Sequence, residues 1–187
     1  MSPREDIEGQ IISKFRRGDA SAMDMLYAEY GGYLAGICHR YISDDEKMKD
    51  VLQESLIKIF TQIGQFHYFG KGSLKAWISR VTINEALSQL RKDKSAALII
   101  QEERLPDLPD EDPDVSGLSA DTLTQLLGKL PPGYRTVINL FAIEGRSHKE
   151  IGEMLGIKPS TSASQFHRAK ILLARIIKEY KINTETR

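Results

Sequence analysis

The stretch SHKEIGEMLGIKPSTSASQFHRAKILLARI, residues 147–176, predicts two helices joined by a tight turn. Apolar residues recur at helical spacing in its first part, at Ile151, Met154 and Leu155. Gly156 follows them, and a glycine past the last apolar residue commonly ends a helix. Pro159 suits the first turn of the next helix, because its missing N–H needs no partner there. Gly152 lacks a side chain, which lets the second helix cross closely.

The second of these helices has one apolar stripe and one polar side. The stripe consists of Ser162, Phe166, Ala169 and Leu173. The polar side and its flanks consist of Ser160, Thr161, Ser164, Gln165 and Arg168, then Ala163, His167 and Lys170. Hydroxyl, amide and cationic groups of this kind bond phosphates and base edges in a major groove, which admits one helix. The pattern predicts a helix-turn-helix that binds nucleic acid, with an ordinary solvated hairpin as the alternative.

Charge is distributed unevenly along the 187 residues, although the formal net charge is zero. Residues 1–92 carry 13 basic and 12 acidic residues, a net charge of +1. Residues 93–120 carry 2 basic and 8 acidic residues, a net charge of −6. Residues 121–187 carry 11 basic and 6 acidic residues, a net charge of +5. A basic C-terminal part provides the field that phosphate binding requires.

Cysteine content and hydropathy exclude several classes of protein. The single cysteine, Cys38, excludes an intramolecular disulfide, and no cluster of Cys and His has metal-ligand spacing. We therefore expect no metal site and no cofactor. The sequence shows neither a secretory signal at its N-terminus nor an apolar run long enough to span a membrane. We expect a cytoplasmic protein with no membrane contact of its own.

The segment RLPDLPDEDPDVSG, residues 104–117, combines three prolines, a glycine and a run of carboxylates. Proline stops helices and like charges repel, so we expect an acidic flexible linker over residues 96–118. It divides the chain into domains at 1–95 and 119–187. Such a linker acts as a solubilising spacer or imitates nucleic acid in a basic channel of a partner, and its composition leaves both interpretations open.

The N-terminal part shows helical periodicity throughout, which predicts an all-α fold of two small helical domains. A helix beginning at Asp19 places Met23, Leu26, Tyr27 and Tyr30 on one face and continues after Gly31 and Gly32 through Leu34, Ile37 and Tyr41, all expected in the core. A second helix, from Asp45 to Phe66, has a predicted core stripe of Leu52, Leu56, Ile59, Phe60 and Ile63. Its opposite side carries Asp50, Gln53, Glu54, Ile57 and Thr61. An isoleucine among acids and amides favours a partner surface, although one exposed isoleucine is also ordinary.

The loop QFHYFGKGS, residues 65–73, places three aromatic residues before a Gly-Lys-Gly element. Aromatic rings hold unstacked bases, and a lysine between glycines approaches phosphate closely. The alternative is that Phe66 and Phe69 cap the core and the glycines only form a turn. The helix of residues 74–91 then directs Leu74, Trp77, Ile78 and Val81 inward and Lys75, Arg80, Asn84, Ser88 and Arg91 outward.

Four blocks of the sequence together resemble a sigma factor of bacterial RNA polymerase, in the sigma-70 family and its small extracytoplasmic-function (ECF) group, which keeps only conserved regions 2 and 4. The segment DVLQE, residues 50–54, resembles the family's D-x-x-Q-E helix. The segment GSLKAWISRV, residues 72–81, with Asn84, resembles its G-[ST]-[FL]-[KR]-x-W-[LI]-x-R-[IV]-x-x-N helix. The segment LPPGYRTV, residues 130–137, resembles the opening of region 4, and Glu144-Gly145 leads into the helix-turn-helix.

The resemblance implies three sets of site residues and three partners. Core RNA polymerase, through the coiled-coil of its largest subunit and its flap, is the first partner, and its implied contacts are Asp50, Gln53, Glu54 and Ile57. Promoter DNA is the second, and the residues implied to open the −10 element are His67, Tyr68, Phe69, Lys71, Ser73, Lys75, Arg80, Asn84 and Arg91. Those implied to contact the −35 element are Arg146, Ser160, Thr161, Ser164, Gln165, His167, Arg168 and Lys170. An anti-sigma factor is the third implied partner, because many members of the family are masked by an inhibitor of this kind.

The second helix of the hairpin departs from the family pattern. Many relatives read G-T-V-K-S-R-L-H-R-A where this chain has STSASQFHRA, residues 160–169. Ala163 and Gln165 replace a lysine and an arginine, so base preference is not carried over and phosphate attraction falls more on Arg146, Arg168 and Lys170. The serine-rich version resembles members from the Bacteroidetes.

Two other function classes are weighed against this one. A helix-turn-helix regulator that binds operators directly would have a similar C-terminal half, but this function would not explain the loop of residues 67–73. An enzyme acting on nucleic acid is disfavoured, because the sequence has no clustered carboxylates for two metals and no phosphate-binding loop. We expect binding without catalysis, and poor binding of promoter duplex by the isolated protein, since two weak contacts on one tether need polymerase to fix their spacing.

Overall fold

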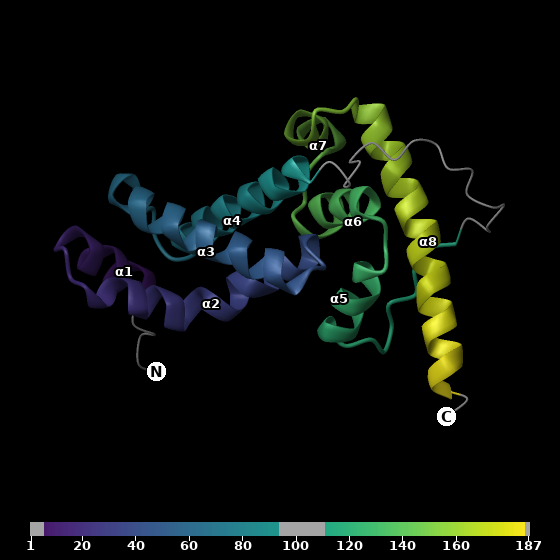
Figure 1. The fold of residues 1–187 in the computed structure, drawn as a ribbon, viewed down its shortest axis with the longest axis horizontal. Helices are drawn as coiled ribbons and strands as arrows, with labels where there is room; N and C mark the ends of the chain where they lie inside the picture. Colours follow the sequence, from purple (N-terminus) through teal and green to yellow (C-terminus); the bar gives the residue numbers. More distant parts are fainter. Residues whose placement is uncertain (1–5, 94–110, 186–187) are drawn as a thin grey trace. The chain divides into compact units, whose positions relative to one another are not determined.

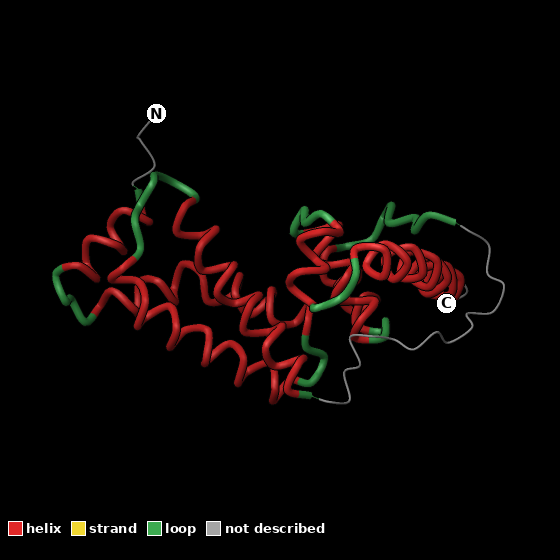
Figure 2. Tube along the Cα trace, turned by 90° about the horizontal axis from the view of Figure 1, so that it is seen from above, coloured by secondary structure: helices red, strands yellow, loops and turns green. Residues whose placement is uncertain are grey.

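The computed structural model describes residues 6–93 and 111–185, and every regular element in this part of the chain is helical (Figures 1 and 2). Contacts group the chain into two compact units, Met1–Gln89 and Leu90–Arg187. The all-α expectation is confirmed for the described residues. The predicted domain limits at residues 95 and 119 stay predictions, and most of the predicted linker lies outside the described residues.

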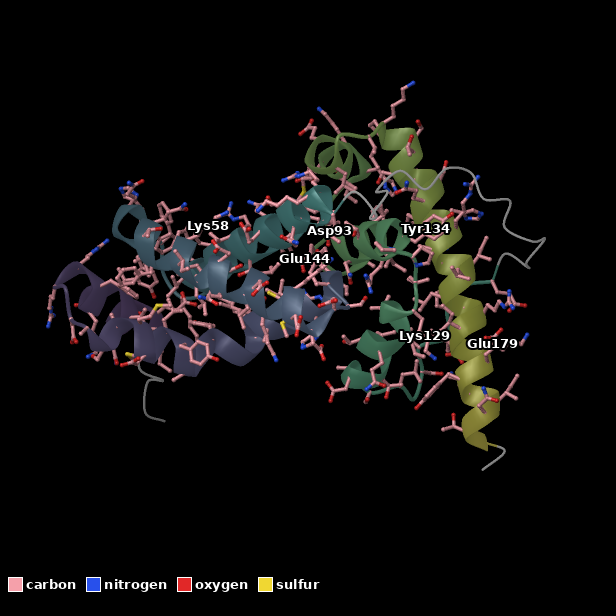
Figure 3. All side chains as sticks on the ribbon, in the orientation of Figure 1. Lys58, Asp93, Lys129, Tyr134, Glu144 and Glu179 are labelled. Carbon is pink, nitrogen blue, oxygen red and sulfur yellow. The ribbon has the colours of Figure 1, made fainter. Side chains whose placement is uncertain are left out.

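The first unit is built from four α-helices and one turn of 3-10 helix. These are α1 (Ile7–Arg16), α2 (Ser21–Tyr41), α3 (Asp45–Gln62), η1 (Ile63–Gln65) and α4 (Ser73–Lys92), of which α4 ends just beyond the limit of the unit at Gln89. Helix α2 packs against both α1 and α3. Lys58 on α3, labelled in Figure 3, pairs with the buried Glu85 carboxylate on α4 and so ties these two helices together.

Helix α2 runs unbroken through Gly31 and Gly32, as the sequence predicts. Its buried side consists of Ala22, Leu26, Tyr30, Gly31, Leu34, Ile37, Cys38 and Tyr41. The expectation for Tyr27 is wrong, because its ring is exposed. Tyr27 lies one position from Leu26. The buried stripe of an amphipathic helix covers only one face, so two adjacent apolar residues are not both buried there.

The buried side of α3 differs from the predicted stripe by about one position. It consists of Met48, Val51, Ser55 and Ile59. The expectation that Phe60 lies in the core is wrong, since 57% of its surface is exposed. Its ring meets the Phe15 ring edge-on, with centroids 6.1 Å apart. Large apolar surface is therefore available on the outer side of α3.

Helix α1 is not among the sequence predictions. Asp6 caps its start by accepting a hydrogen bond from the Gly9 amide at 3.1 Å. Ile11 and Ile12 are buried against the rest of the first unit. With ten residues and a polar first turn, the helix gives too few apolar positions for its period to stand out.

The second unit contains α5 (Ala120–Gly128), α6 (Pro132–Ile138), the π-helical turn η2 (Asn139–Ile143), α7 (His148–Leu155) and the long α8 (Pro159–Glu185). In Figure 1, α8 is the yellow helix, and it packs against α5, α6 and α7. The hydrophobic core of the second unit includes Leu126, Leu127, Leu130, Tyr134, Ile138, Ala169, Leu173 and Ile177. Tyr134, labelled in Figure 3, brings α6 into this core. One long helix thus serves as the support for three short ones.

Candidate nucleic-acid interface

The hairpin predicted at residues 147–176 is present as α7, a tight turn and the start of α8. Ser147 and Glu150 form a reciprocal capping box at the start of α7. Gly156 ends α7 at a φ of +69°, a left-handed conformation that glycine adopts without strain. A Cβ on Gly152 would lie 2.7 Å from the Ile157 carbonyl oxygen. These features fix the angle at which α8 leaves α7.

The start of α8 offers a short polar face. Ser160, Ser164 and His167 are exposed at spacings of four and three residues, and Thr161, Arg168 and Lys170 are partly buried beside them. The Ser164 hydroxyl donates to the Ser160 carbonyl oxygen at 3.0 Å. The predicted outward direction is therefore confirmed for Ser160 and Ser164, and His167, predicted at the flank, is also exposed.

The outward direction predicted for Gln165 is wrong, because only 4% of its surface is exposed. The residues that α8 buries in its first turns are Ser162, Gln165, Ala169 and Leu173, at spacings of three and four. Phe166 lies at the edge of that stripe and packs against Phe141, with ring centroids 4.4 Å apart and ring planes tilted by 43°. Gln165 contributes to the packing of α8 in this structure, not to its polar face.

The described end of the predicted linker lies along α8. Asp112 pairs with Lys170, and Asp114 accepts a hydrogen bond from Lys181 at 2.7 Å. The Lys181 ammonium is the main cause of the lowered pKa of the Asp114 carboxyl. Pro113 and Val115 line an apolar pocket together with Phe166. Lys170 therefore has a carboxylate partner in this structure, and residues 111–118 are attached to the second unit.

Helix α3 carries the predicted partner face. Asp50, Gln53, Glu54 and Ile57 are all exposed, and their spacing of three and four residues places them on one side of the helix. Ile57 has 48% of its surface exposed. Phe60, three residues further, adds a second large apolar side chain that the sequence analysis missed. Its position at i+3 from Ile57 was a signal available in the sequence.

The aromatic loop divides into anchored and free rings. Phe66 packs on Trp77 of α4, with ring centroids 5.1 Å apart, so its role in capping the core is confirmed. The Tyr68 hydroxyl lies 2.6 Å from both carboxylate oxygens of Asp6. This bond raises the pKa of Tyr68 to about 12. Phe69 is 85% exposed, and His67 and Lys71 are also exposed. A core-capping role for Phe69 is therefore excluded.

The conformation of the turn that leads into α4 depends on two glycines and a serine within it. Gly70 and Gly72 have φ angles of +102° and +92°, which side chains rarely tolerate. The Ser73 hydroxyl donates to the Gly70 carbonyl oxygen at 2.6 Å and accepts from the Phe69 amide at 3.2 Å. Ser73, predicted as a DNA contact, thus uses its hydroxyl within the loop. The result is a closed turn that leaves the Phe69 ring outside.

Helix α4 presents polar and basic side chains beyond that turn. Arg80, Asn84 and Arg91 are exposed and lie four and seven residues apart, on one side of the helix. Lys75 is also exposed, and its ammonium lies 4.3 Å from the centre of the Tyr33 ring. The adjacent Tyr33 hydroxyl is hydrogen-bonded to Ser79 at 3.1 Å. Tyr33, from α2, therefore orients Lys75.

Within residues 6–93 and 111–185, no group of three or more His, Cys, Asp or Glu side chains is arranged to hold a metal ion. In the same part of the chain, no helix combines the length and the apolar character needed to cross a membrane.

Two models of conserved protein regions match this chain. Residues 26–96 match sigma-70 region 2, and residues 120–173 match sigma-70 region 4. The two matches lie in the order that the sequence predicts and together span more than half of the chain. The chain belongs to the sigma-70 family.

Two curated relatives of this sigma protein are named as ECF sigma factors. The ECF RNA polymerase sigma factor SigE of Mycolicibacterium smegmatis is 29% identical over 176 residues, which cover 89% of this chain and 67% of the relative. The ECF RNA polymerase sigma factor SigW of Bacillus subtilis is 29% identical over 181 residues, which cover 90% of this chain and 95% of the relative.

A solved structure supports the fold of this sigma protein. The sigma factor RpoE, in complex with the anti-sigma factor NepR from Bartonella quintana, has 21% sequence identity and a TM-score of 0.51. The likeness covers 85% of this chain and 98% of that chain. Helices α3 and α4, with the exposed Phe69 loop between them, fall in the segment matched by region 2. Helix α7 and the first part of α8 fall in the segment matched by region 4.

Proposed function

We propose that this protein is an ECF-type sigma factor, which binds core RNA polymerase, recognises the −35 and −10 promoter elements and promotes promoter melting. The observation that carries the proposal is the presence of regions 2 and 4 in order on one chain. Region 2 presents outward most of the side chains that the family resemblance implies, and region 4 exposes Ser160, Ser164 and His167 of its set. The protein acts by binding, in the cytoplasm, and performs no catalysis of its own.

Region 2 docks on the coiled-coil of the largest polymerase subunit through the exposed side of α3. Ile57 and Phe60 supply apolar area, and Asp50, Gln53 and Glu54 supply acceptors and an amide around it. An apolar centre with a polar rim is the usual composition of a specific protein interface. Region 4 contacts the flap of the polymerase.

Region 2 also opens the −10 element. Phe69, with its ring exposed, stacks on an unstacked base, and Lys71 approaches a phosphate between two glycines. Asn84 offers an amide to a base edge, and Arg80 and Arg91 lie on the same side of α4 to bind backbone phosphates. Unstacking a base costs a few kcal/mol, which base stacking on an aromatic ring offsets at about 1–3 kcal/mol.

Region 4 holds the −35 element through the polar start of α8. Ser160, Ser164 and His167 face outward there, and Arg168 contributes a cation. Arg146, just before α7, pairs with Glu150 at 3.4 Å in the free protein. Gln165 is left out of this contact set, because its side chain is buried.

An anti-sigma factor is a further partner in this proposal, because the sigma factor RpoE was solved with one. The faces that it would cover are those that bind polymerase and DNA, so no separate inhibitor motif is required.

A filter-binding experiment with sheared genomic DNA distinguishes a sigma factor from a regulator that binds DNA without polymerase. The protein alone, core polymerase alone and the two together are each mixed with genomic fragments, and the fragments held on a filter are sequenced. We expect specific fragments only with the mixture, because each DNA contact is weak until polymerase fixes the spacing of the two regions. Specific retention by the isolated protein, unchanged by polymerase, would identify an operator-binding regulator instead.

Replacing Arg168 with alanine should weaken binding of the complete polymerase to −35-containing DNA by about tenfold at low salt, since a charge-assisted phosphate contact is lost. The slope of log affinity against log salt concentration should fall by about one. Arg175→Ala is the matched control, because Arg175 is exposed two turns further along α8, where it pairs with Glu179 at 2.8 Å. An unchanged salt slope in Arg168→Ala would remove Arg168 from the contact set.

A further inference from the structure

Glu8, in the first turn of α1, is a buried carboxylate with an unusual set of partners. Only 5% of its surface is exposed. It accepts hydrogen bonds from the amides of Gly72 at 2.8 Å, Leu74 at 3.1 Å and Lys75 at 3.4 Å. The Tyr30 hydroxyl of α2 donates to it at 3.0 Å. One side chain of α1 thus caps the first turn of α4, more than 60 residues away in the sequence.

A carboxylate suits this place for two reasons. The first amides of a helix have no partner within the helix, and their aligned dipoles favour a negative charge. A carboxylate accepts from several donors at once, whereas an amide side chain would direct its own N–H groups at some of them. Burial is tolerated because four donors compensate the lost hydration.

Asp6, at the start of the same helix, holds the other end of the loop. Its carboxylate accepts the Tyr68 hydroxyl at 2.6 Å and the Gly9 amide at 3.1 Å. Asp6 therefore connects the loop to the cap of α1. Phe69 follows Tyr68 directly, and Gly72 lies three residues after Phe69, so the free aromatic ring stands between the two anchor points.

We propose that Asp6 and Glu8 are positioning residues for the −10 loop, which hold Tyr68 and the start of α4 so that Phe69 meets a base without first ordering the loop. This inference rests on the proposed function. Neither residue lies in the segment matched by the region 2 model, residues 26–96, and neither belongs to the site residues implied by the family resemblance. Ordering a loop before binding removes an entropic cost from the binding step.

The first test compares Glu8→Gln with the wild-type protein. Hydrogen exchange at the amides of Gly72, Leu74 and Lys75 should become faster by about tenfold or more, because each amide loses a charged acceptor. Affinity for core polymerase should be unchanged, since the α3 face is untouched. The matched control is Glu29→Gln, which changes an exposed glutamate on α2.

The DNA part of this test uses a single-stranded oligonucleotide with the non-template −10 sequence, read from transcripts that the wild-type holoenzyme starts. Holoenzyme with Glu8→Gln should bind it about tenfold more weakly, while binding of a duplex that carries only the −35 element stays the same. A general loss of stability would lower polymerase affinity and −35 binding together, so these readouts separate positioning from folding.

A second pair of variants does not touch the buried carboxylate. Tyr68→Phe keeps the ring and removes the hydroxyl, and Asp6→Asn removes the charged acceptor. Each should weaken oligonucleotide binding, and the double variant should be no worse than the single ones, because both remove one shared interaction. Additive effects would contradict a shared positioning role.

Two negative results have different meanings in these experiments. If the wild-type holoenzyme starts no transcripts, the proposed function fails. If it starts transcripts and both Glu8→Gln and Tyr68→Phe bind the oligonucleotide as the wild type does, the function stands and the positioning role of α1 is wrong.

Discussion

Replacing Ile57 with glutamate should reduce affinity for core RNA polymerase by about 30-fold to 1000-fold, corresponding to about 2–4 kcal/mol for a central interface residue. Ile57 is the exposed apolar side chain among Asp50, Gln53 and Glu54, and a carboxylate there has no cation on the same face of α3 to pair with. Burying it against a partner leaves the charge uncompensated. Fluorescence anisotropy with labelled protein and purified core polymerase measures the change.

The control for this variant is Ile182→Glu, which makes the same change at an exposed isoleucine near the end of α8. It should bind polymerase within about twofold of the wild-type affinity, as surface substitutions outside an interface do. Phe60→Ala should fall between the two variants, because Phe60 lies on the same side of α3 as Ile57. Wild-type affinity in Ile57→Glu would show that α3 does not dock on polymerase.

Replacing Phe69 with alanine should reduce the formation of open promoter complexes by about 5-fold to 150-fold. The loss corresponds to about 1–3 kcal/mol for the stacking of one base on an aromatic ring. The fold should not change, because 85% of the surface of Phe69 is exposed. Permanganate reactivity of thymines in the −10 element measures opening directly.

Two further variants serve as controls for Phe69→Ala. Phe69→Trp keeps an aromatic face and should retain most of the opening, whereas Phe66→Ala should lower protein stability because Phe66 packs on Trp77. Binding to core polymerase should be the same in Phe69→Ala and the wild type. Equal permanganate reactivity in Phe69→Ala and the wild type would assign base capture to another residue.

The helix-turn-helix was predictable because its determinants are local. Gly156 and Pro159 mark the end of one helix and the start of the next, and the structure uses both as predicted. The exposed direction of Asp50, Gln53, Glu54 and Ile57 was also predictable, since residues at i, i+3, i+4 and i+7 share one face of a helix.

The errors at Phe60, Tyr27 and Gln165 have one physical cause. Each lies next to a residue that the structure buries or half-buries, and helical periodicity fixes the buried direction only to within about one position. Which neighbour is covered depends on the helices that pack against it. On α8, the first turns bury Gln165 on the stripe between Ser162 and Ala169, and Phe166 is left at the edge against Phe141.

The contacts of Asp6, Glu8 and Lys170 could not be predicted from periodicity at all. The pairs Asp6–Tyr68, Glu8–Lys75 and Lys170–Asp112 join residues separated by 58 to 67 positions in the sequence, and a carboxylate carries no local sign of its distant donor. Glu8 in particular lies in a polar helical turn and would be assigned to solvent by its residue type alone. Only the fold brings it under the first turn of α4.

In the proposed function, this protein directs core polymerase to promoters with two separated elements. Run-off transcription on sheared genomic DNA, with core polymerase from the source organism and sequencing of transcript 5′ ends, tests it most directly. We expect new start sites that share two motifs about two helical turns apart and that disappear with Asn84→Ala. A set of start sites identical to that of core polymerase alone would contradict the claim.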